Sequence, residues 1–126
     1  MARLTAEFWD TRVILQRIHG NDADLGVNAR TGIMNLYEAV HNTLLRQGKR
    51  EARGLLAILG NTIEELSHER ILAASEFRVR EKHRGLSYAD AAGYVTAREL
   101  NAVFVTTDKA FKGLPGVKIV LRVEPS

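Results

Sequence analysis

Four acidic residues occupy positions at which strands end or helices begin in this sequence. Asp10 follows the apolar run LTAEFW, and Asp108 follows the run VFVTT. Glu38 and Asp90 each fall in the first turn of an expected helix. In open α/β sheets, strand ends and the following helix starts lie along one edge, where ligands bind. We therefore expect these carboxylates to converge.

Carboxylates brought together in this way call for a cation. Like charges raise one another's pKa values unless an ion of opposite charge joins them. A site made only of oxygen ligands suits a hard ion, Mg²⁺ or Mn²⁺. Such an ion holds phosphate groups and activates water for in-line attack. The quartet Asp10, Glu38, Asp90 and Asp108 is therefore a candidate metal-binding and catalytic site.

Each acid also has a purely structural interpretation. Acids in a first helical turn complement the helix dipole, which covers Glu38 and Asp90, and Ser87 with Asp90 forms a capping-box pattern. Asp10 and Asp108 suit N-cap positions. Taken singly, each acid is better interpreted as a cap. The cap interpretation is less convincing for the four acids together, because the sequence has only five aspartates and two of them end well-formed strands.

The elements that must position these acids alternate along the chain. Apolar runs predict strands, and helical spacing with glycine stops predicts helices. The expected strands are 4–9, 31–36, 61–66, 102–107 and 117–123. The expected helices are 13–19, 37–48, 49–60, 67–85 and 87–100, with 21–29 as a short helix or loop. This order predicts a parallel sheet between two helical layers, a three-layer α/β/α fold.

Composition places the chain among globular proteins. Its 126 residues, 45% apolar and 26% charged, suit a single domain spanning 1–126. The lack of cysteine excludes disulfides, thiolate metal sites and cysteine nucleophiles, and it fits a reducing compartment. No apolar run could span a membrane and MARLTAEFWD lacks a signal-peptide core, so we expect a cytoplasmic protein without a membrane partner.

The basic residues allow a nucleic-acid partner without requiring one. A net charge of +3, from 13 arginines and 5 lysines, fits an ordinary solvated surface equally well. Two groups are spaced closely along the chain: Arg46, Lys49, Arg50 and Arg53, and then Arg78, Arg80, Lys82 and Arg84. If they rim the acidic edge, they would hold a phosphate backbone. Otherwise they are solvated faces.

Two other kinds of site find less support. Glu38-x-x-His41 and Glu65-x-x-His68 match the spacing of di-iron helical bundles, but the strand-rich C-terminal half contradicts that architecture. We therefore interpret His41 and His68 as surface or packing residues. The glycine-rich phosphate-binding motifs of nucleotide-binding proteins do not occur in the sequence.

Several motifs resemble those of the PIN-domain family, and most of all its VapC-type toxins of toxin–antitoxin pairs. The most specific match is LSYADA, whose acid is followed eighteen residues later by that of TTDKAF; EFWDTRVIL and NLYEAV match more weakly. The resemblance implies a PIN-type sandwich and Mg²⁺- or Mn²⁺-dependent cleavage of RNA. It maps the acidic quartet onto the four acids already selected, and it adds Thr106 as a hydroxyl supporting metal or water. It also implies homodimers and a small antitoxin partner.

One departure from the family pattern concerns Arg12, where asparagine or serine usually orients the first aspartate. Arg12 would either contact substrate phosphate or pair with an acid and weaken metal binding. We expect Arg12, Arg84 and Lys109 to bind substrate. The leading prediction is a metal-dependent endoribonuclease, and the alternative is a non-catalytic RNA-binding or dimerisation module. A phosphoacceptor domain ranks lower, because Lys118 begins the last strand rather than ending it.

Overall fold

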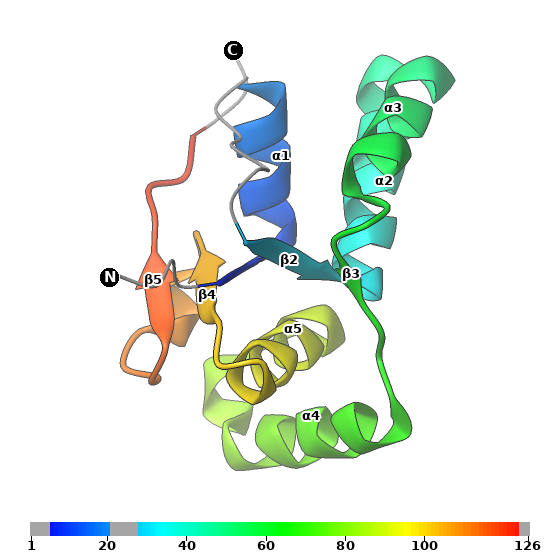
Figure 1. Cartoon of the computed structure of the whole chain (residues 1–126). Coiled ribbons are helices and arrows are strands. Elements are labelled where there is room, and N and C mark those ends of the chain that lie inside the picture. Colours follow the sequence, from blue (N-terminus) through cyan, green and yellow to red (C-terminus); the bar gives the residue numbers. More distant parts are fainter. Residues whose placement is uncertain (1–5, 21–27, 124–126) are drawn as a thin grey trace, which may run out of the picture.

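The computed structural model describes residues 6–20 and 28–123. Its strands are β1 (Glu7–Trp9), β2 (Ala29–Gly32), β3 (Ile63–Glu64), β4 (Val103–Thr106) and β5 (Val117–Ile119). Its helices are α1 (Thr11–His19), α2 (Ile33–Gln47), α3 (Lys49–Leu59), α4 (His68–Arg80) and α5 (Tyr88–Glu99), with two 3-10 turns, η1 (Lys82–Arg84) and η2 (Lys109–Phe111). The order of strands and helices is the predicted one (Figure 1).

The strands form one parallel sheet in the order β3-β2-β1-β4-β5. One face of the sheet is covered by α1, α2 and α3, and the other by α4 and α5 (Figure 1). The predicted three-layer α/β/α fold is therefore confirmed. Because β1 and β4 are neighbours, Asp10 and Asp108 follow adjacent strands at the same edge of the sheet.

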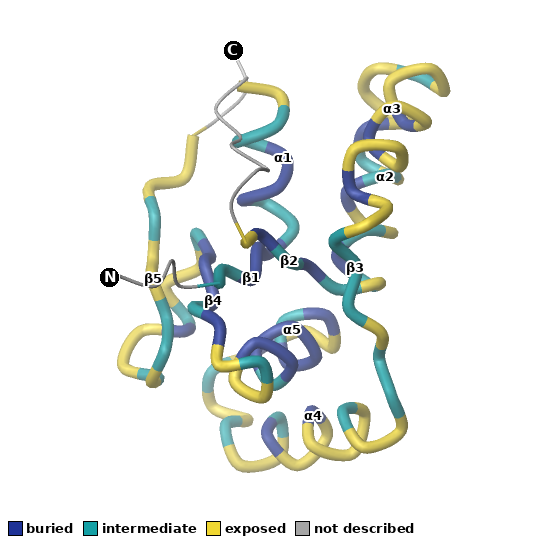
Figure 2. The backbone as a smooth tube through the Cα atoms, viewed as in Figure 1, coloured by how far each residue is buried: buried dark blue, intermediate teal, exposed yellow. Residues whose placement is uncertain are grey.

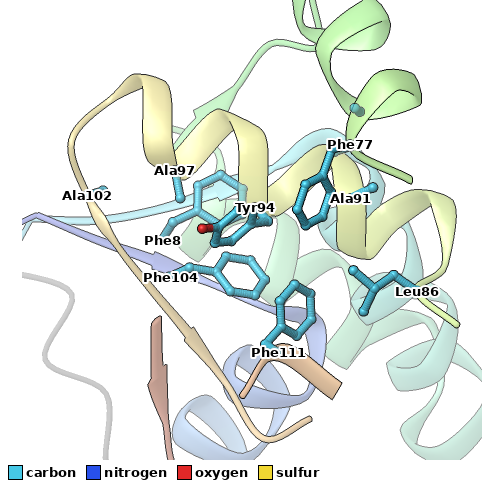
Figure 3. Packing of buried hydrophobic residues seen from close by; sticks show 11 residues of the cluster. Phe8, Phe77, Leu86, Ala91, Tyr94, Ala97, Ala102, Phe104 and Phe111 are labelled. Atoms are coloured by element: carbon cyan, nitrogen blue, oxygen red, sulfur yellow. The ribbon is translucent and has the colours of Figure 1, made fainter. Parts of the chain in front are cut away.

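Alternate residues of the central strands fill two separate cores, since successive side chains in a strand point to opposite faces. Phe8 and Phe104 stack with their ring centroids 5.9 Å apart beneath α5, where Tyr94 and Phe111 complete an aromatic cluster (Figure 3). Trp9, the next residue of β1, belongs to the aliphatic core under α1 and α2. Burying side chains of this size stabilises the fold by about 1.5–3 kcal/mol each.

Small residues let α5 approach the sheet. Ala91 and Gly93 are buried, and a Cβ on Gly93 would lie 3.1 Å from the Phe8 ring and 3.2 Å from the Phe104 ring. Burial follows the layers, with β1, β4 and α5 mostly buried and the outer sides of α3 and α4 exposed (Figure 2). No helix within residues 6–20 and 28–123 combines the length and apolar character needed to cross a bilayer.

The second strand lies earlier than predicted, so the strand expected at 31–36 is wrong from residue 33 onward. β2 ends at Gly32 and α2 begins at Ile33. The buried residues of this helix are Asn35, Ala39 and Thr43, which recur every fourth position and so form one helical face. The apolar residues at 33–36 therefore belong to the first turn of a helix.

Two other predicted elements are shorter than expected. The helix expected over 67–85 ends at Arg80, and the chain continues through η1 to Gly85, which closes that turn with a φ of 66°. The strand expected over 117–123 ends at Ile119. The short edge strand predicted within 61–66 is confirmed as β3. Of the segment 21–29, residues 21–27 lie outside the described residues.

Candidate active site

Asp10 lies at the inner end of the site, directly after β1. The residue is only 8% exposed, and its side chain caps α1 by accepting a hydrogen bond from the Thr11 backbone N–H at 2.9 Å. The second carboxylate oxygen, Oδ2, accepts from the Thr106 hydroxyl at 2.8 Å. Thr106 is fully buried at the end of β4 and also accepts from the Asp108 backbone N–H at 3.1 Å. One hydroxyl thus links the first and last acids of the quartet.

A buried asparagine completes the fixation of Asp10. Asn35 is 1% exposed, and its Nδ2 donates both to Asp10 Oδ1 at 3.2 Å and to Thr11 Oγ1 at 3.1 Å. Thr11 in turn donates to Glu38 Oε1 at 2.9 Å. Asn35 and Glu38 lie one turn apart on α2, so this helix contributes to the site twice. The network runs from the buried acid to the exposed one.

Asp90 and Asp108 both act as caps, as the structural interpretation predicted. Asp90 Oδ2 accepts from the Ser87 backbone N–H at 2.9 Å and Ser87 Oγ accepts from the Asp90 N–H, which completes the predicted capping box. Asp108 Oδ1 accepts from the Ala110 N–H at 2.8 Å at the start of η2. Each cap uses one carboxylate oxygen. Within the described residues, the other oxygen of each acid has no hydrogen bond.

The four acids nevertheless line one cleft of about 870 Å³. Asp10, Asp90 and Asp108 therefore cap helical turns and also converge on one cleft with Glu38. The acids come from four elements far apart in the sequence, namely the starts of α1, α5 and η2 and the second turn of α2. The complete lining comprises Asp10, Thr11, Arg12, Leu15, Glu38, His41, Asn42, Leu45, Ser87, Asp90, Thr107, Asp108, Lys109 and Arg122.

The environment of Asp10 disfavours its charge. Burial raises the pKa of the Asp10 carboxyl to about 6, against an ordinary value of 3.8. The hydrogen bond from Thr106 and that from the Thr11 N–H oppose the rise, whereas the negative charges of Asp90 and Glu38 add to it. A carboxylate held in this position is stabilised by any cation that enters the cleft.

The donor set fits a hard divalent cation, but the four acids do not form a closed cage. Within residues 6–20 and 28–123, no three His, Asp or Glu side chains lie close enough together to hold a metal ion. The chemistry of the lining is carboxylate and hydroxyl oxygen, which suits Mg²⁺ or Mn²⁺. A bound cation would favour the charged form of Asp10 and so lower its raised pKa.

The predicted substrate-binding residues separate into two kinds. Arg12 and Lys109 both line the cleft. Arg12 makes no hydrogen bond or ion pair with the described residues, so the structure gives no pairing of Arg12 with an acid. Arg84 does not line the cleft. Its Nη1 donates to the carbonyls of Ala110 and Lys112, both at 2.8 Å, so it holds the chain around η2.

The histidines of the two Glu-x-x-His patterns, His41 and His68, lie in different parts of the fold. His41 is exposed at the edge of the cleft, and His68 is exposed at the start of α4. The fold is not a helical bundle, which agrees with rejecting the di-iron interpretation. Sequence reasoning missed Asn35, Thr11 and Arg122 as members of the site. The signal for Asn35 was a polar residue one turn before Glu38 at a position that a helical period places in the core.

Comparisons with known proteins bear on the family and the fold of the chain. The sequence model of the PIN-domain family matches residues 10–117. No curated protein matches the chain.

Three solved structures share the fold. A toxin–antitoxin complex from Klebsiella pneumoniae has a TM-score of 0.73 at 20% identity and covers 95% of this chain and 100% of the matched chain. VapC20 of Mycobacterium tuberculosis, a toxin that cleaves the sarcin–ricin loop, has a TM-score of 0.72 at 22% identity, with 90% and 98% covered. DNA-bound VapBC of Salmonella typhimurium has a TM-score of 0.71 at 15% identity, with 94% and 99% covered.

At these identities the solved structures establish a common fold, and the sequence motif match extends over most of the chain. The matched range spans the positions of Asp10, Glu38, Asp90 and Asp108, which line the cleft. The chain therefore belongs to the PIN-domain family.

Proposed function

We propose that this protein is a Mg²⁺- or Mn²⁺-dependent endoribonuclease and the toxin of a toxin–antitoxin pair. The observation that carries the proposal is one cleft lined by four carboxylates from distant segments, with the pKa of the innermost raised to about 6. Clusters of carboxylates that share no cation are unfavourable, so such a cleft is suited to binding one. The fold shared with toxin structures supports the same conclusion.

In this proposal Asp10, Glu38, Asp90 and Asp108 hold the ion, directly or through water. The bound ion would polarise a phosphodiester oxygen and lower the pKa of an attacking water. Asn35, Thr106 and the Thr11 N–H keep the Asp10 carboxylate in place by donating to it. Glu38, Asp90 and Asp108 lie at the more open part of the cleft, where their unshared oxygens can turn toward an ion.

Arg12 and Lys109 are the proposed phosphate contacts in the cleft. A guanidinium suits the paired oxygens of a phosphate, and Arg12 is not engaged by an acid among the described residues. Arg84 is left out of this set because its guanidinium is bound to backbone carbonyls.

The proposed protein partners are a second copy of this chain and a small antitoxin. The support is the exposure of several large apolar side chains on α3 and α4, namely Leu56, Ile58, Ile71, Leu72 and Val79. Structures of the same fold include toxin–antitoxin complexes. Light scattering should give a dimer, and a short protein encoded beside this chain should co-purify with it as a stable complex.

The test is incubation with structured RNAs, with and without Mg²⁺. Attack by activated water should leave 5′-phosphate and 3′-hydroxyl ends, and a chelator should stop cleavage. Cleavage that persists in chelator, with 2′,3′-cyclic phosphate products, would contradict the mechanism.

A second candidate is the non-catalytic module of the same fold. The observation in its favour is that no three potential ligands within residues 6–20 and 28–123 lie close enough to hold a metal ion. That candidate predicts RNA binding or dimerisation without cleavage at any Mg²⁺ concentration, so the same incubation distinguishes the two.

A further inference from the structure

The segment after β5 leaves the sheet and crosses to α1. The N–H of Val120 donates to the Thr106 carbonyl at 2.8 Å, which is the last bond of this segment to β4. The side chain of Gln16 then binds the residues that follow. Its Nε2 donates to the Leu121 carbonyl at 2.9 Å, and its Oε1 accepts from the Val123 N–H at 3.1 Å. Figure 1 shows this segment continuing from the end of β5 along the side of α1.

This arrangement fixes the backbone on both sides of Arg122. A primary amide carries both a donor and an acceptor, so one Gln side chain can pair with a carbonyl and an N–H two residues apart. Gln16 lies four residues after Arg12 and therefore on the same face of α1. These two hydrogen bonds of Gln16, here called the clamp, thus hold residues 120–123, here called the terminal segment, on the face of α1 that carries Arg12.

The clamp brings Arg122 to the acidic cleft. Arg122 lines the cleft together with Arg12 and Lys109, whereas its exposed neighbours Leu121 and Val123 do not. Three cationic side chains from three separate segments therefore stand around the four carboxylates. A polyanionic chain approaching this cleft meets repulsion from the acids unless cations contact its phosphates.

We propose that Arg122 is a substrate-binding residue that contacts an RNA phosphate at the cleft, and that Gln16 positions it. This inference rests on the proposed ribonuclease function. An arginine remains charged at all working pH values, and its planar fork matches a pair of phosphate oxygens.

Binding of a short single-stranded RNA tests this role without cleavage if every protein carries Asp10→Asn. Arg122→Ala should weaken binding about fivefold, the size expected of one exposed ionic contact. It should also reduce the slope of log affinity against log salt by about 0.7. Arg122→Lys should restore the slope. Lys118→Ala is the matched control, because Lys118 is exposed on β5 and does not line the cleft.

Gln16→Ala tests the clamp. It should weaken binding in the presence of Arg122 but add nothing to Arg122→Ala, because both changes remove the same contact. If Arg122→Ala behaves like Lys118→Ala, or tightens binding, Arg122 does not contact substrate and the proposal is overturned. Additive losses from Gln16→Ala and Arg122→Ala would overturn the clamp. If the wild type cleaves RNA while these variants match the control, only this inference fails; if the wild type neither binds nor cleaves RNA, the ribonuclease function fails with it.

Discussion

The inner end of the cleft and its outer rim hold their acids by different means. Asp10 is buried and receives hydrogen bonds from Thr106, Asn35 and the Thr11 N–H, so its position is fixed by three elements at once. At the rim, Glu38 and Asp108 are exposed and Asp90 is half-buried. The comparison teaches that one charge is anchored where burial disfavours it, while the others retain freedom to move toward an ion.

The largest expected effect is the loss of cleavage when the inner charge is removed. Asp10→Asn should keep the shape, because its amide can donate to Thr106 Oγ1 while its oxygen accepts from Thr11 and Asn35. Removing the central charge of the site should lower the rate of RNA cleavage by at least about 100-fold. An initial-rate assay at saturating Mg²⁺ measures the effect. Activity within a few-fold of wild type would show that Asp10 is not part of the reaction site.

The next effect concerns stability against pH in the absence of metal. The folded pKa of Asp10, about 6, lies above its ordinary value of 3.8. The folded state therefore gains stability from this group below pH about 4, and loses it as the pH rises through about 6. Two pKa units correspond to about 3 kcal/mol of unfolding free energy.

Urea unfolding at pH 4 and at pH 7 measures this change. The wild type should lose about 2.4 kcal/mol relative to Asp10→Asn over that range, since the unfolded carboxyl is already partly ionised at pH 4 and the other titrating groups are common to both proteins. Parallel stability profiles of the two proteins would contradict the raised pKa.

A smaller effect is expected from the residue that anchors the inner acid. Asn35→Ala removes donors to Asp10 and Thr11, which should raise the pKa of Asp10 further and cost about 1–3 kcal/mol of stability. Loss of such a supporting bond should also reduce activity about tenfold or more. The matched control is Asn61→Ala, at an exposed turn that does not line the cleft. Equal behaviour of the two variants in unfolding and cleavage would remove Asn35 from the site.

The smallest effect belongs to the rim. If Arg12 contacts substrate, Arg12→Ala should weaken RNA binding by about fivefold or less and lower its salt dependence. The fold should be unaffected, because Arg12 makes no hydrogen bond with the described residues. A gain in Mg²⁺ affinity in Arg12→Asn, measured by calorimetry, would instead identify Arg12 as a residue that opposes the ion.

The same contrast explains how much could be predicted from the sequence. The parallel sheet and the convergence of the four acids on one cleft were predictable, because strand ends and the following helix starts lie along one edge of the sheet in any such fold. The anchoring residues were not, since Asn35 was placed in a strand and its partner Asp10 lies 25 residues away in the chain. Gly32 ends β2 and the helical face that carries Asn35 begins at once, so the apolar run 31–36 misled the assignment.

The terminal segment shows a second limit of sequence reasoning. The alternation in VKIVLRV predicted a strand to residue 123, but β5 ends at Ile119. Gln16, 105 residues before Leu121, takes over the pairing of the backbone there. An alternation of apolar and polar residues shows that a segment suits a sheet. Whether a neighbouring strand is available to pair with it depends on the rest of the fold. Arg122 lines the cleft because Gln16 binds the backbone on both sides of it, and no local sequence pattern predicts this position.

The most direct test of the account is the effect of Mg²⁺ on unfolding at pH 7 in the wild type and in Asp10→Asn. If the four carboxylates form one metal site, Mg²⁺ at 100 times its Kd should stabilise the wild type by about 2.7 kcal/mol. A domain of this size should then show a rise in Tm of several degrees, and Asp10→Asn should lose most of it. The same should hold for Asp108→Asn, whose N-cap bond an asparagine retains. If Mg²⁺ shifts the melting curve of none of these proteins, the cleft is not a metal site and the acids are helix caps.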